Sequence, residues 1–547
     1  MQDVSCDVLV VGAGPSGLIL ALCLAMSNIS VRIIDKEPSY RVGRRGAGIT
    51  PRTLEVFKML GVLDEVLKIA HAPAVFQSYV LPEGVKPLKT WAMSPTLEPT
   101  PSCPFLNAVF LGQDQVEGIL RDHLKQFGCV VELGTQLLDF EQHSEHVSAR
   151  VSSVENFIKA KYLVGADGAK GIVRKHLGLS FLGETRTEDQ LIVSDVILDG
   201  LDKEHIHMWT KGPAATILAW PGQTTQNLFS VQMAGKELDR QKVLSNPEEF
   251  RLFLESHTGR KDIRLREIVW ISEYIPNIRM VEEVGKDRVF IVGDAAHVHS
   301  LFGGQGMNSS VQDSFNLAWK LASVVLNLST PKLLSTYGEE RLPVIAEMLD
   351  KTTELHKKAF KSDKLDDTAH WKRNKSLDQL GVNYRWSSIV LNERPTSNEE
   401  RTAYGSDTEA GIPLAAGDRA PDAPGLLELN GYDGARTLSL FDVFKYTAHT
   451  VLLFCPVVGT SAVHEIIDFL SGVSRKVQSV VVLPPGVDVT VSNEALFVRD
   501  EDGHGFRGYF APLDCMCCVA VRPDGMVGAI VSGKVGLSQY LNTLSAS

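Results

Sequence analysis

Two glycine-rich segments, far apart in the sequence, have residue types that suit a phosphate-containing cofactor. In the first, Gly12, Gly14 and Gly17 fit the pattern G-x-G-x-x-G after an apolar run. The first glycine makes a turn, the second lets a pyrophosphate approach the backbone, and the third lets helix and strand pack closely. The following helix, which contains Ser16, offers amide donors to the phosphates. Asp35 ends the next apolar run, where it could accept hydrogen bonds from a ribose.

This first segment predicts a dinucleotide site at one end of a β-α-β unit. It does not distinguish NAD from FAD, because both contain an ADP half. A tight turn in an unrelated α/β domain is the alternative that the glycine pattern alone leaves open.

The second segment, residues 288–308, reads RVFIVGDAAHVHSLFGGQGMN. We predict a strand over 288–292, a sharp exit at Gly293, and Asp294 placed to bind a polyol hydroxyl. Glycines that leave room for a flat ring follow: Gly303, Gly304 and Gly306. N-cap candidates for the long helix after them are Asn308, Ser309 and Ser310. A ring at that helix N-terminus would be stabilised in an anionic state, which suits a reduced isoalloxazine.

Composition and charge exclude several other classes of protein. The chain has 547 residues, enough for two or three domains, and a formal net charge of −11. An acidic chain is a poor partner for nucleic acid or an anionic membrane. The N-terminus does not resemble a signal peptide and we find no transmembrane run, so we predict a cytoplasmic protein without a membrane span.

The cysteines raise the question of redox or metal chemistry. Cys515 and Cys518 have C-x-x-C spacing, but the surrounding letters CMCCVAV are typical of a strand. We therefore expect buried structural thiols in preference to a redox pair, and we predict no metal site.

A third segment extends the pattern to a known family. Residues 162–178 read YLVGADGAKGIVRKHLG, and together with the two glycine segments they resemble the FAD-dependent aromatic hydroxylases of the 4-hydroxybenzoate and phenol hydroxylase family. The resemblance implies FAD as cofactor and NAD(P)H as reductant. We find no second nucleotide fingerprint, in agreement with the family's lack of a separate nicotinamide domain. The resemblance also implies that the two glycine segments meet around one extended flavin nucleotide.

The resemblance assigns roles to individual residues. Arg45 matches a family arginine that contacts the flavin and could move or retain it during the reaction, so it is our one catalytic candidate. Gln113 would bind near the ribityl or ribose, although a surface helix with a Glu117–Arg121 pair is the alternative. Asp167 and Asp294 would support the ribityl chain and phosphates. Residues expected to line the flavin ring are Gly304, Gln305, Gly306, Met307 and Asn308. The family usually has proline where this chain has Leu301.

The expected fold is α/β, with a Rossmann-type FAD-binding domain, an inserted antiparallel-sheet substrate domain and a C-terminal thioredoxin-like domain. The FAD-binding domain would be discontinuous, over 1–70, 111–184 and 281–350. Residues 71–110 and 185–280 would form the substrate sheet, 351–412 a helical segment and linker, and 413–547 the thioredoxin-like domain. Candidates for contact with substrate are His205, His207, Trp209, Trp220 and Met233, although each could equally lie on the sheet surface or in the core.

The resemblance implies an NAD(P)H-dependent FAD monooxygenase that hydroxylates a phenolic substrate with O2 through a flavin C4a-hydroperoxide. A carboxylate on the attacked carbon would lead to oxidative decarboxylation of a hydroxybenzoate instead. No proton-relay residue is evident from spacing, and His297 and His299 are either structural or proton-transferring. Alternatives are another flavin oxygenase, such as an epoxidase, on this scaffold and a non-catalytic binding protein similar to GDP-dissociation inhibitors. A homodimer is expected only from the family.

Overall fold

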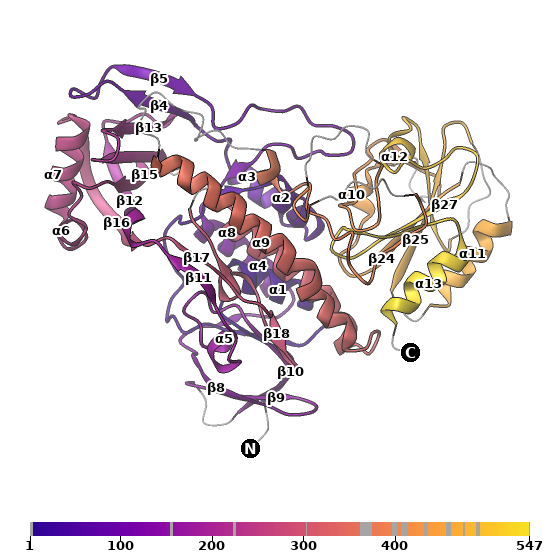
Figure 1. Ribbon diagram of the computed structural model, residues 1–547. Coiled ribbons are helices and arrows are strands. Elements are labelled where there is room, and N and C mark those ends of the chain that lie inside the picture. Colours follow the sequence, from indigo (N-terminus) through magenta and orange to yellow (C-terminus); the bar gives the residue numbers. More distant parts are fainter. Residues whose placement is uncertain are drawn as a thin grey trace.

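The described residues of the computed structural model are organised around three large sheets, the third of them in the C-terminal part (Figure 1). The structure describes residues 4–153, 157–222, 226–301, 303–361, 375–395, 402–405, 413–430, 436–455, 461–473, 476–487 and 493–545. The predicted helical segment and linker, 351–412, therefore lies partly outside the described residues. Among the helices described, none is both long and apolar enough to cross a membrane.

The first sheet is mostly parallel, with strand order β18-β19-β10-β1-β2-β7 and the β8–β9 hairpin beside β10. Its strands are β1 (Val4–Val11), β2 (Val31–Ile34), β7 (Val131–Glu132), β8 (Leu137–Gln142), β9 (Val147–Val151), β10 (Ile158–Gly165), β18 (Gly285–Lys286) and β19 (Val289–Ile291). β19, β10, β1, β2 and β7 run parallel. Val8, Leu9 and Val10 of β1 are completely buried, as a strand covered on both faces requires.

Helices cover this sheet and connect it to the glycine segments. They are α1 (Pro15–Met26), α2 (Pro51–Met59), α3 (Leu63–Ile69), α4 (Gln113–Gln126), α5 (Ile172–His176), α8 (Gly306–Val325) and α9 (Lys332–Lys361). α8 packs along α1, and α9 crosses the front of the molecule in Figure 1. The predicted start of α8 at residues 308–310 is wrong, because the backbone N–H of Ser309 already donates to the Gln305 carbonyl and the helix begins at Gly306.

The second sheet has strand order β16-β12-β15-β14-β13-β4-β5. Its strands are β4 (Val75–Tyr79), β5 (Pro87–Trp91), β12 (Leu191–Asp199), β13 (His205–Thr210), β14 (Thr216–Pro221), β15 (Leu228–Ala234) and β16 (Arg264–Tyr274). Neighbours are antiparallel except β13 and β4, which run parallel. α6 (Arg240–Ser245) and α7 (Pro247–Thr258) pack on one face, at the left of Figure 1.

Two small sheets lie between these parts of the chain. One contains β11 (Leu182–Thr185), β17 (Asn277–Met280) and β20 (His297–Val298). The other is the two-stranded ribbon of β3 (Gly48–Ile49) and β6 (Val109–Phe110). Short strands and loops therefore connect the second sheet with the part of the protein that contains the first sheet.

The C-terminal sheet has the order β21-β28-β27-β24-β25-β26-β22-β23. Its strands are β21 (Leu391–Asn392), β22 (Leu426–Glu428), β23 (Thr437–Leu438), β24 (His449–Phe454), β25 (Val477–Leu483), β26 (Leu496–Asp500), β27 (Cys517–Val521) and β28 (Val527–Val531). Its helices are α10 (Leu440–Val443), α11 (Ser461–Ser471), α12 (His504–Gly508) and α13 (Lys534–Leu544). β24, β25 and β26 are parallel, and β27 and β28 are antiparallel. A thioredoxin-like assignment stays a prediction.

The cysteines of this part only partly follow the expectation. All eight cysteines of the chain are free. Cys518 is buried as predicted, but Cys515 is exposed because β27 begins only at Cys517. The prediction that both members of the C-x-x-C spacing are buried is therefore wrong for Cys515.

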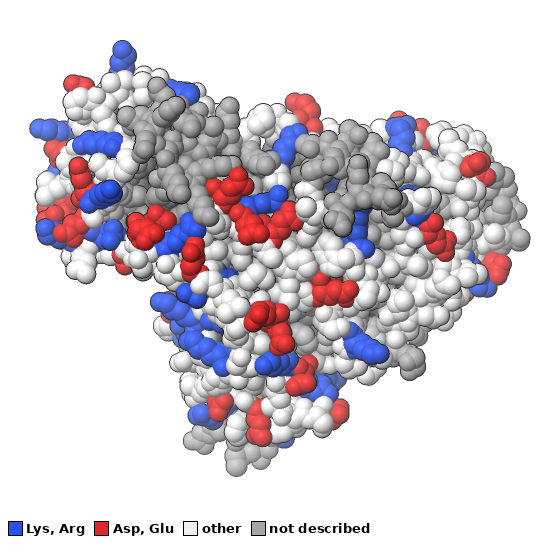
Figure 2. Space-filling model, in the orientation of Figure 1, with Lys and Arg blue, Asp and Glu red and all other residues white. Residues whose placement is uncertain are grey.

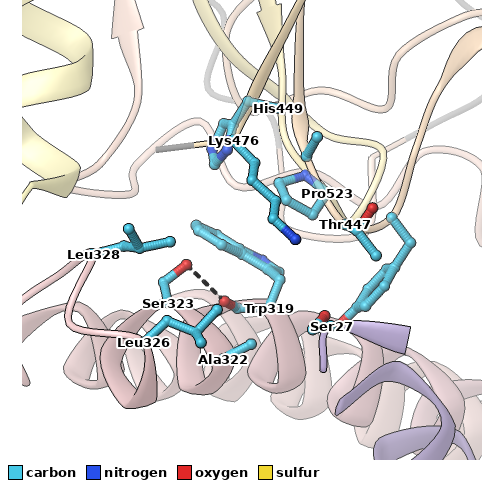
Figure 3. A pocket seen from close by; sticks show the side chains of 12 residues that line it. Ser27, Trp319, Ala322, Ser323, Leu326, Leu328, Thr447, His449, Lys476 and Pro523 are labelled. Atoms are coloured by element: carbon cyan, nitrogen blue, oxygen red, sulfur yellow. Dashed lines mark hydrogen bonds between the residues drawn. The ribbon is translucent and has the colours of Figure 1, made fainter. Parts of the chain in front are cut away.

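A buried ion network joins the C-terminal part to α8 and α9. Arg522 forms ion pairs of 2.7 Å with Glu340 and 2.5 Å with Asp524, and Lys320 lies 2.7 Å from Glu340. Asp524 also accepts a hydrogen bond of 3.1 Å from Trp319 of α8. Figure 3 shows the pocket beside this contact, which residues from α1, α8 and the C-terminal part line together.

Charged residues on the outer surface are mixed in sign. Figure 2 shows Lys and Arg interspersed with Asp and Glu over the face that it displays. This pattern agrees with the balance in the sequence, which has 55 basic and 66 acidic residues.

Candidate functional site

The first glycine turn has the geometry that the three glycines predict. A Cβ on Gly12, whose φ is +105°, would lie 2.3 Å from the Ala166 carbonyl oxygen, and one on Gly17 would lie 1.9 Å from the Gly12 carbonyl oxygen. A Cβ on Gly14 would meet no described atom within 4 Å. Packing therefore requires glycine at the first and third positions, whereas the second faces open space.

The N-terminus of α1 is oriented to bind an anion. Gly14 is its N-cap residue, and no described side chain caps the first-turn amides. These amide donors, and the positive end of the helix dipole, lie beside the open space at Gly14. An anionic group such as a pyrophosphate fits this arrangement.

Asp35 orders the glycine turn from the end of β2. Its Oδ2 accepts a hydrogen bond of 2.8 Å from the Ala13 N–H, and its Oδ1 accepts one of 3.0 Å from the Glu37 N–H. Each carboxylate oxygen has a second lone pair, so these contacts leave capacity for a ribose hydroxyl. The ribose contact itself stays a prediction.

The two glycine segments lie in contact. A Cβ on Gly293, whose φ is +62°, would lie 2.8 Å from Ser310 Oγ and 2.9 Å from Ser16 Oγ. Ser314 Oγ in α8 donates a hydrogen bond of 2.8 Å to the Ser16 carbonyl oxygen. The turn before α1 and the loop before α8 therefore border one site, as the sequence predicted.

Asp294 faces this site from the loop after β19. Its side chain is exposed, yet the surrounding protein removes enough water to raise the pKa of its carboxyl group. Arg45 shows the same combination, with an exposed side chain and a guanidinium pKa lowered by desolvation. Asp294 and Arg45 interact electrostatically. Both side chains are therefore neighbours in the space that is open to solvent beside the glycine segments.

Residues 304–308 contribute to this space in two different ways. Gly304, with φ of +61°, would have no described atom near a Cβ, whereas a Cβ on Gly306 would lie 2.9 Å from His299 Nε2. Gln305 is buried and donates to the Gly303 and Leu377 carbonyl oxygens at 2.7 and 3.0 Å.

Asn308 is also directed into the protein, and Met307 packs partly against the main core. Asn308 Oδ1 accepts a hydrogen bond of 2.9 Å from the Thr50 N–H, and its Nδ2 donates to the Gly48 and Gly304 carbonyl oxygens at 2.9 and 2.8 Å. The amide side chains of Gln305 and Asn308 therefore fix the loop, and a contact from these residues to a flavin ring would have to come from the backbone.

The remaining predicted cofactor residues lie nearby on other elements. Gln113 Nε2 donates to Glu117 Oε1 at 2.8 Å, and the Gln113 N–H donates to the Arg44 carbonyl oxygen at 3.0 Å. The alternative Glu117–Arg121 pair is also present, at 3.8 Å.

Asp167 lies in the loop after β10. Its Oδ2 accepts a hydrogen bond of 3.1 Å from the Val173 N–H, and burial raises the pKa of its carboxyl group. A Cβ on Gly171 would lie 2.1 Å from Asp167 Cγ, so the glycine at position 171 allows this carboxylate to pack against the start of α5.

The two histidines after Asp294 differ in their surroundings. His297 Nε2 contacts Asp313 Oδ2 at 2.6 Å, and Arg341 Nε donates to Asp313 Oδ1 at 2.8 Å. Burial would raise the pKa of Asp313, but Arg341 and His297 lower it to about 2. Burial lowers the pKa of His299 to about 4, so this imidazole is neutral at pH 7. The His297–Asp313–Arg341 cluster is structural in the geometry observed.

The sheet candidates for substrate contact divide between two faces. His207, Trp209 and Met233 are buried on the face that α7 covers, and His207 and Trp209 use their ring nitrogens for internal hydrogen bonds. These three therefore belong to the core, which was the alternative to a substrate contact. His205 pairs with Asp202 at 2.9 Å on an exposed edge.

Trp220 lies on the opposite face, toward the glycine segments. It stacks on Phe110 with ring centroids 6.0 Å apart, and Phe110 stacks on His71 at 6.1 Å. His71 Nδ1 lies 2.9 Å from the Ala72 carbonyl oxygen, which makes Nδ1 the protonated nitrogen. Since Phe110 pairs with Gly48 in the β3–β6 ribbon, this aromatic row lies close to the N-terminus of α8.

Two residues on this face were missed by the sequence reasoning. Trp270 of β16 lies under the Arg45 guanidinium, with Cζ 5.7 Å from the ring centroid. Asp195 of β12 is 1% exposed and accepts a hydrogen bond of 2.6 Å from the Arg44 N–H. Asp195 could have been found from the sequence, because it is an acidic residue inside an apolar strand and a buried carboxylate needs a specific partner.

Comparison with known proteins agrees with this geometry. Residues 5–352 match the family model described as an FAD binding domain. The flavin-dependent monooxygenase of Mycobacteroides abscessus is 34% identical over 548 residues, 98% of this chain and 99% of that protein. Pentachlorophenol 4-monooxygenase of Sphingobium chlorophenolicum is 28% identical over 96% of this chain and 94% of its own length.

Solved structures share the fold. The flavin-dependent monooxygenase PieE in complex with FAD and substrate has a TM-score of 0.81 at 21% identity, with 99% of this chain and 100% of that chain covered. A ternary complex of aklavinone-11 hydroxylase with FAD and aklavinone has a TM-score of 0.78 at 24% identity, with 99% of each chain covered. From the family match and the full-length relative, the chain belongs to the family of FAD-dependent monooxygenases.

Proposed function

We propose that the protein uses NAD(P)H and O2 to hydroxylate a phenolic aromatic substrate that binds between the second sheet and the flavin site. The main support is the position of Arg45, which lies beside Asp294 and over Trp270, on the sheet face that also contains Trp220. Relatives named for pentachlorophenol and aklavinone also favour an aromatic substrate.

The chain's residues would bind and orient the reactants. The amides before α1 would hold the FAD pyrophosphate beside Gly14, while Asp294 and Asp167 would accept hydrogen bonds from the ribityl hydroxyls. When bound, FAD supplies the redox chemistry, accepting a hydride from NAD(P)H and transferring one oxygen atom from O2 to a ring carbon. A phenolic ring against Phe110 and Trp220 would be held by stacking in a place from which water is excluded.

The neutral imidazole of His71 fits this proposal. A phenol reacts faster as the phenolate, so a group that accepts its proton would help. Burial lowers the pKa of His71, so its imidazole is neutral at pH 7 and Nε2 can accept a proton. Nε2 has no hydrogen-bond partner among the described residues, which leaves it available to a substrate. Oxidative decarboxylation would follow from the same arrangement if the attacked carbon carried a carboxylate.

A substrate screen tests this function. Purified protein should bind FAD, and a panel of phenols and hydroxybenzoates should include a compound that accelerates oxidation of NADH or NADPH. Mass spectrometry should then find a product with one added oxygen atom, or one that has also lost carbon dioxide. Peroxide formation without any oxygenated product across the panel would contradict the hydroxylase proposal.

The same screen separates the alternatives. An epoxidase on this scaffold would give an oxygenated product from an alkene but not from a phenol. A binding protein similar to GDP-dissociation inhibitors would neither retain FAD nor oxidise NAD(P)H. The expected homodimer is a separate prediction, tested by the molecular mass of the protein in solution.

A further inference from the structure

A short segment, Gly43–Arg45, is fixed against the second sheet. A Cβ on Gly43 would lie 3.3 Å from Asp195 Oδ2 and 3.6 Å from the Trp270 ring. The Arg44 N–H donates to Asp195 Oδ2 at 2.6 Å, and Arg44 Nη1 donates to the Pro221 carbonyl oxygen at 3.0 Å. The segment therefore takes its position from β12, β14 and β16 on one side and from α4 on the other, where the Gln113 N–H donates to the Arg44 carbonyl oxygen at 3.0 Å.

The backbone of this segment has conformations that need support. Gly43 has φ of +115° and Arg45 has φ of +42°, in the left-handed region that non-glycine residues seldom adopt. Such a residue keeps its conformation only when surrounding contacts hold it. For Arg45 the contacts are the Trp270 ring below its guanidinium and, at the preceding residue, the hydrogen bonds of Arg44 with Asp195 and with the Gln113 N–H.

Asp195 and Trp270 form a matched pair on neighbouring strands. They are partners in the β12–β16 register, and a bulge follows directly between Asp195 and Val196. Asp195 is also the register partner of Ser230 on β15. A carboxylate buried this deeply is costly, and here it contacts a backbone N–H in the arginine segment. The hydrogen bond to the Arg44 N–H explains why a carboxylate is buried at this position.

We propose that Asp195 is a positioning residue, which keeps Arg45 over Trp270 and beside Asp294 so that the arginine can retain the flavin in its reacting position. The proposal rests on the function proposed above. It makes the substrate sheet, and not the nucleotide-binding part alone, responsible for the placement of the flavin-facing arginine. Loss of the Asp195 hydrogen bond should loosen the segment and let Arg45 leave its position over Trp270.

Limited proteolysis tests this without catalysis. Trypsin cleaves after arginine, so release of the segment in Asp195→Ala should speed cleavage after Arg44 or Arg45 by about tenfold, the factor for about 1.4 kcal/mol. Asp195→Asn keeps an oxygen that accepts from the Arg44 N–H and should stay within about twofold of wild type. Asp199→Ala, on the same strand but paired with Arg266 on the exposed side, is the matched control and should also resemble wild type.

A second measurement uses the FAD-loaded enzyme with its best substrate. Asp195→Ala should divert NAD(P)H oxidation toward peroxide while the substrate KM changes little, and Asp195→Asn should restore coupling to product. Thermal unfolding of each variant identifies one that has merely lost its fold. A folded Asp195→Ala with wild-type proteolysis would overturn the proposal, as would an Asp195→Asn variant as defective as the alanine variant. If wild type shows no substrate-dependent oxidation, the proposed function fails, while proteolysis still decides the role of Asp195.

Discussion

Alanine substitutions at Gly14 and Gly17 should separate cofactor binding from folding. A methyl group at position 17 would lie 1.9 Å from the Gly12 carbonyl oxygen, a backbone atom that cannot move without opening the turn. Overpacking of this kind costs about 1–3 kcal/mol or more. At position 14 the methyl group would meet no described atom within 4 Å, and φ is −76°, which alanine readily adopts.

The stability of the FAD-free protein should therefore change little in Gly14→Ala. Alanine is a poorer N-cap than glycine, but it also restricts the unfolded chain, which contributes about 0.4–1 kcal/mol in the opposite direction. The net change should be within about 1 kcal/mol. FAD affinity should fall by about 10-fold to 150-fold, because the methyl group occupies the approach of the pyrophosphate and weakens charged hydrogen bonds worth about 1.5–3 kcal/mol.

Two measurements on the same samples check this pair. FAD is removed, thermal unfolding of each FAD-free variant is recorded, and FAD is titrated back while its fluorescence is followed. Gly14→Ala should unfold near wild type and bind FAD weakly, whereas Gly17→Ala should unfold at a clearly lower temperature. Wild-type FAD affinity in Gly14→Ala, or equal stability of the two FAD-free variants, would refute the proposed roles of these glycines.

Three further predictions concern two buried carboxylates and one exposed thiol. Glu340→Gln removes the charge that Lys320 and Arg522 share in a fully buried network, so the free energy of unfolding in denaturant should fall by about 3–5 kcal/mol. The pKa of Asp313 is lowered to about 2 in the folded protein, so its contribution to stability is complete above pH 4 and should be lost as pH falls toward 2; Asp313→Asn should flatten this part of an acid-unfolding curve. A thiol reagent should modify Cys515 rapidly in native protein, and Cys515→Ser should remove that fast phase; a fast phase that persists would contradict the exposed position.

The nucleotide-binding part was predictable because its sequence signals are local. Gly12 and Gly17 have steric reasons, since a Cβ on Gly12 would meet the Ala166 carbonyl oxygen and one on Gly17 the Gly12 carbonyl oxygen, while Gly14 leaves open space for a pyrophosphate, as the pattern predicts. The strand before Gly293 and the contact of its loop with the first turn followed from the same kind of signal. Only the start of α8 differed, because Asn308 uses its side chain to hold Thr50 and Gly48, and the helix begins before it.

The second sheet was less predictable, because alternation along a strand does not tell which of its two faces is covered by helices. Alternation tells that His207 and Trp209 share one face of β13, but not that α7 covers this face. Trp220, on β14, has a similar apolar setting in sequence and lies on the other face. Asp195 was missed for a related reason, since its partner Arg44 is distant in the chain and the contact depends on how two parts of the fold meet.

α8 connects the candidate flavin site to the C-terminal part. Its first turn holds the second glycine segment and β3 through Asn308, which donates to the Gly304 and Gly48 carbonyl oxygens, while Trp319 and Lys320, further along, contact the buried network of Glu340 and Asp524. Because the helix is buried along its length, a shift at one end cannot be absorbed by solvent and must move packed side chains. We therefore expect the C-terminal part to support the flavin site through this helix. Glu340→Gln should thus weaken FAD binding as well as stability, although Glu340 contacts α8 at Asn316 and Lys320 and not at its first turn.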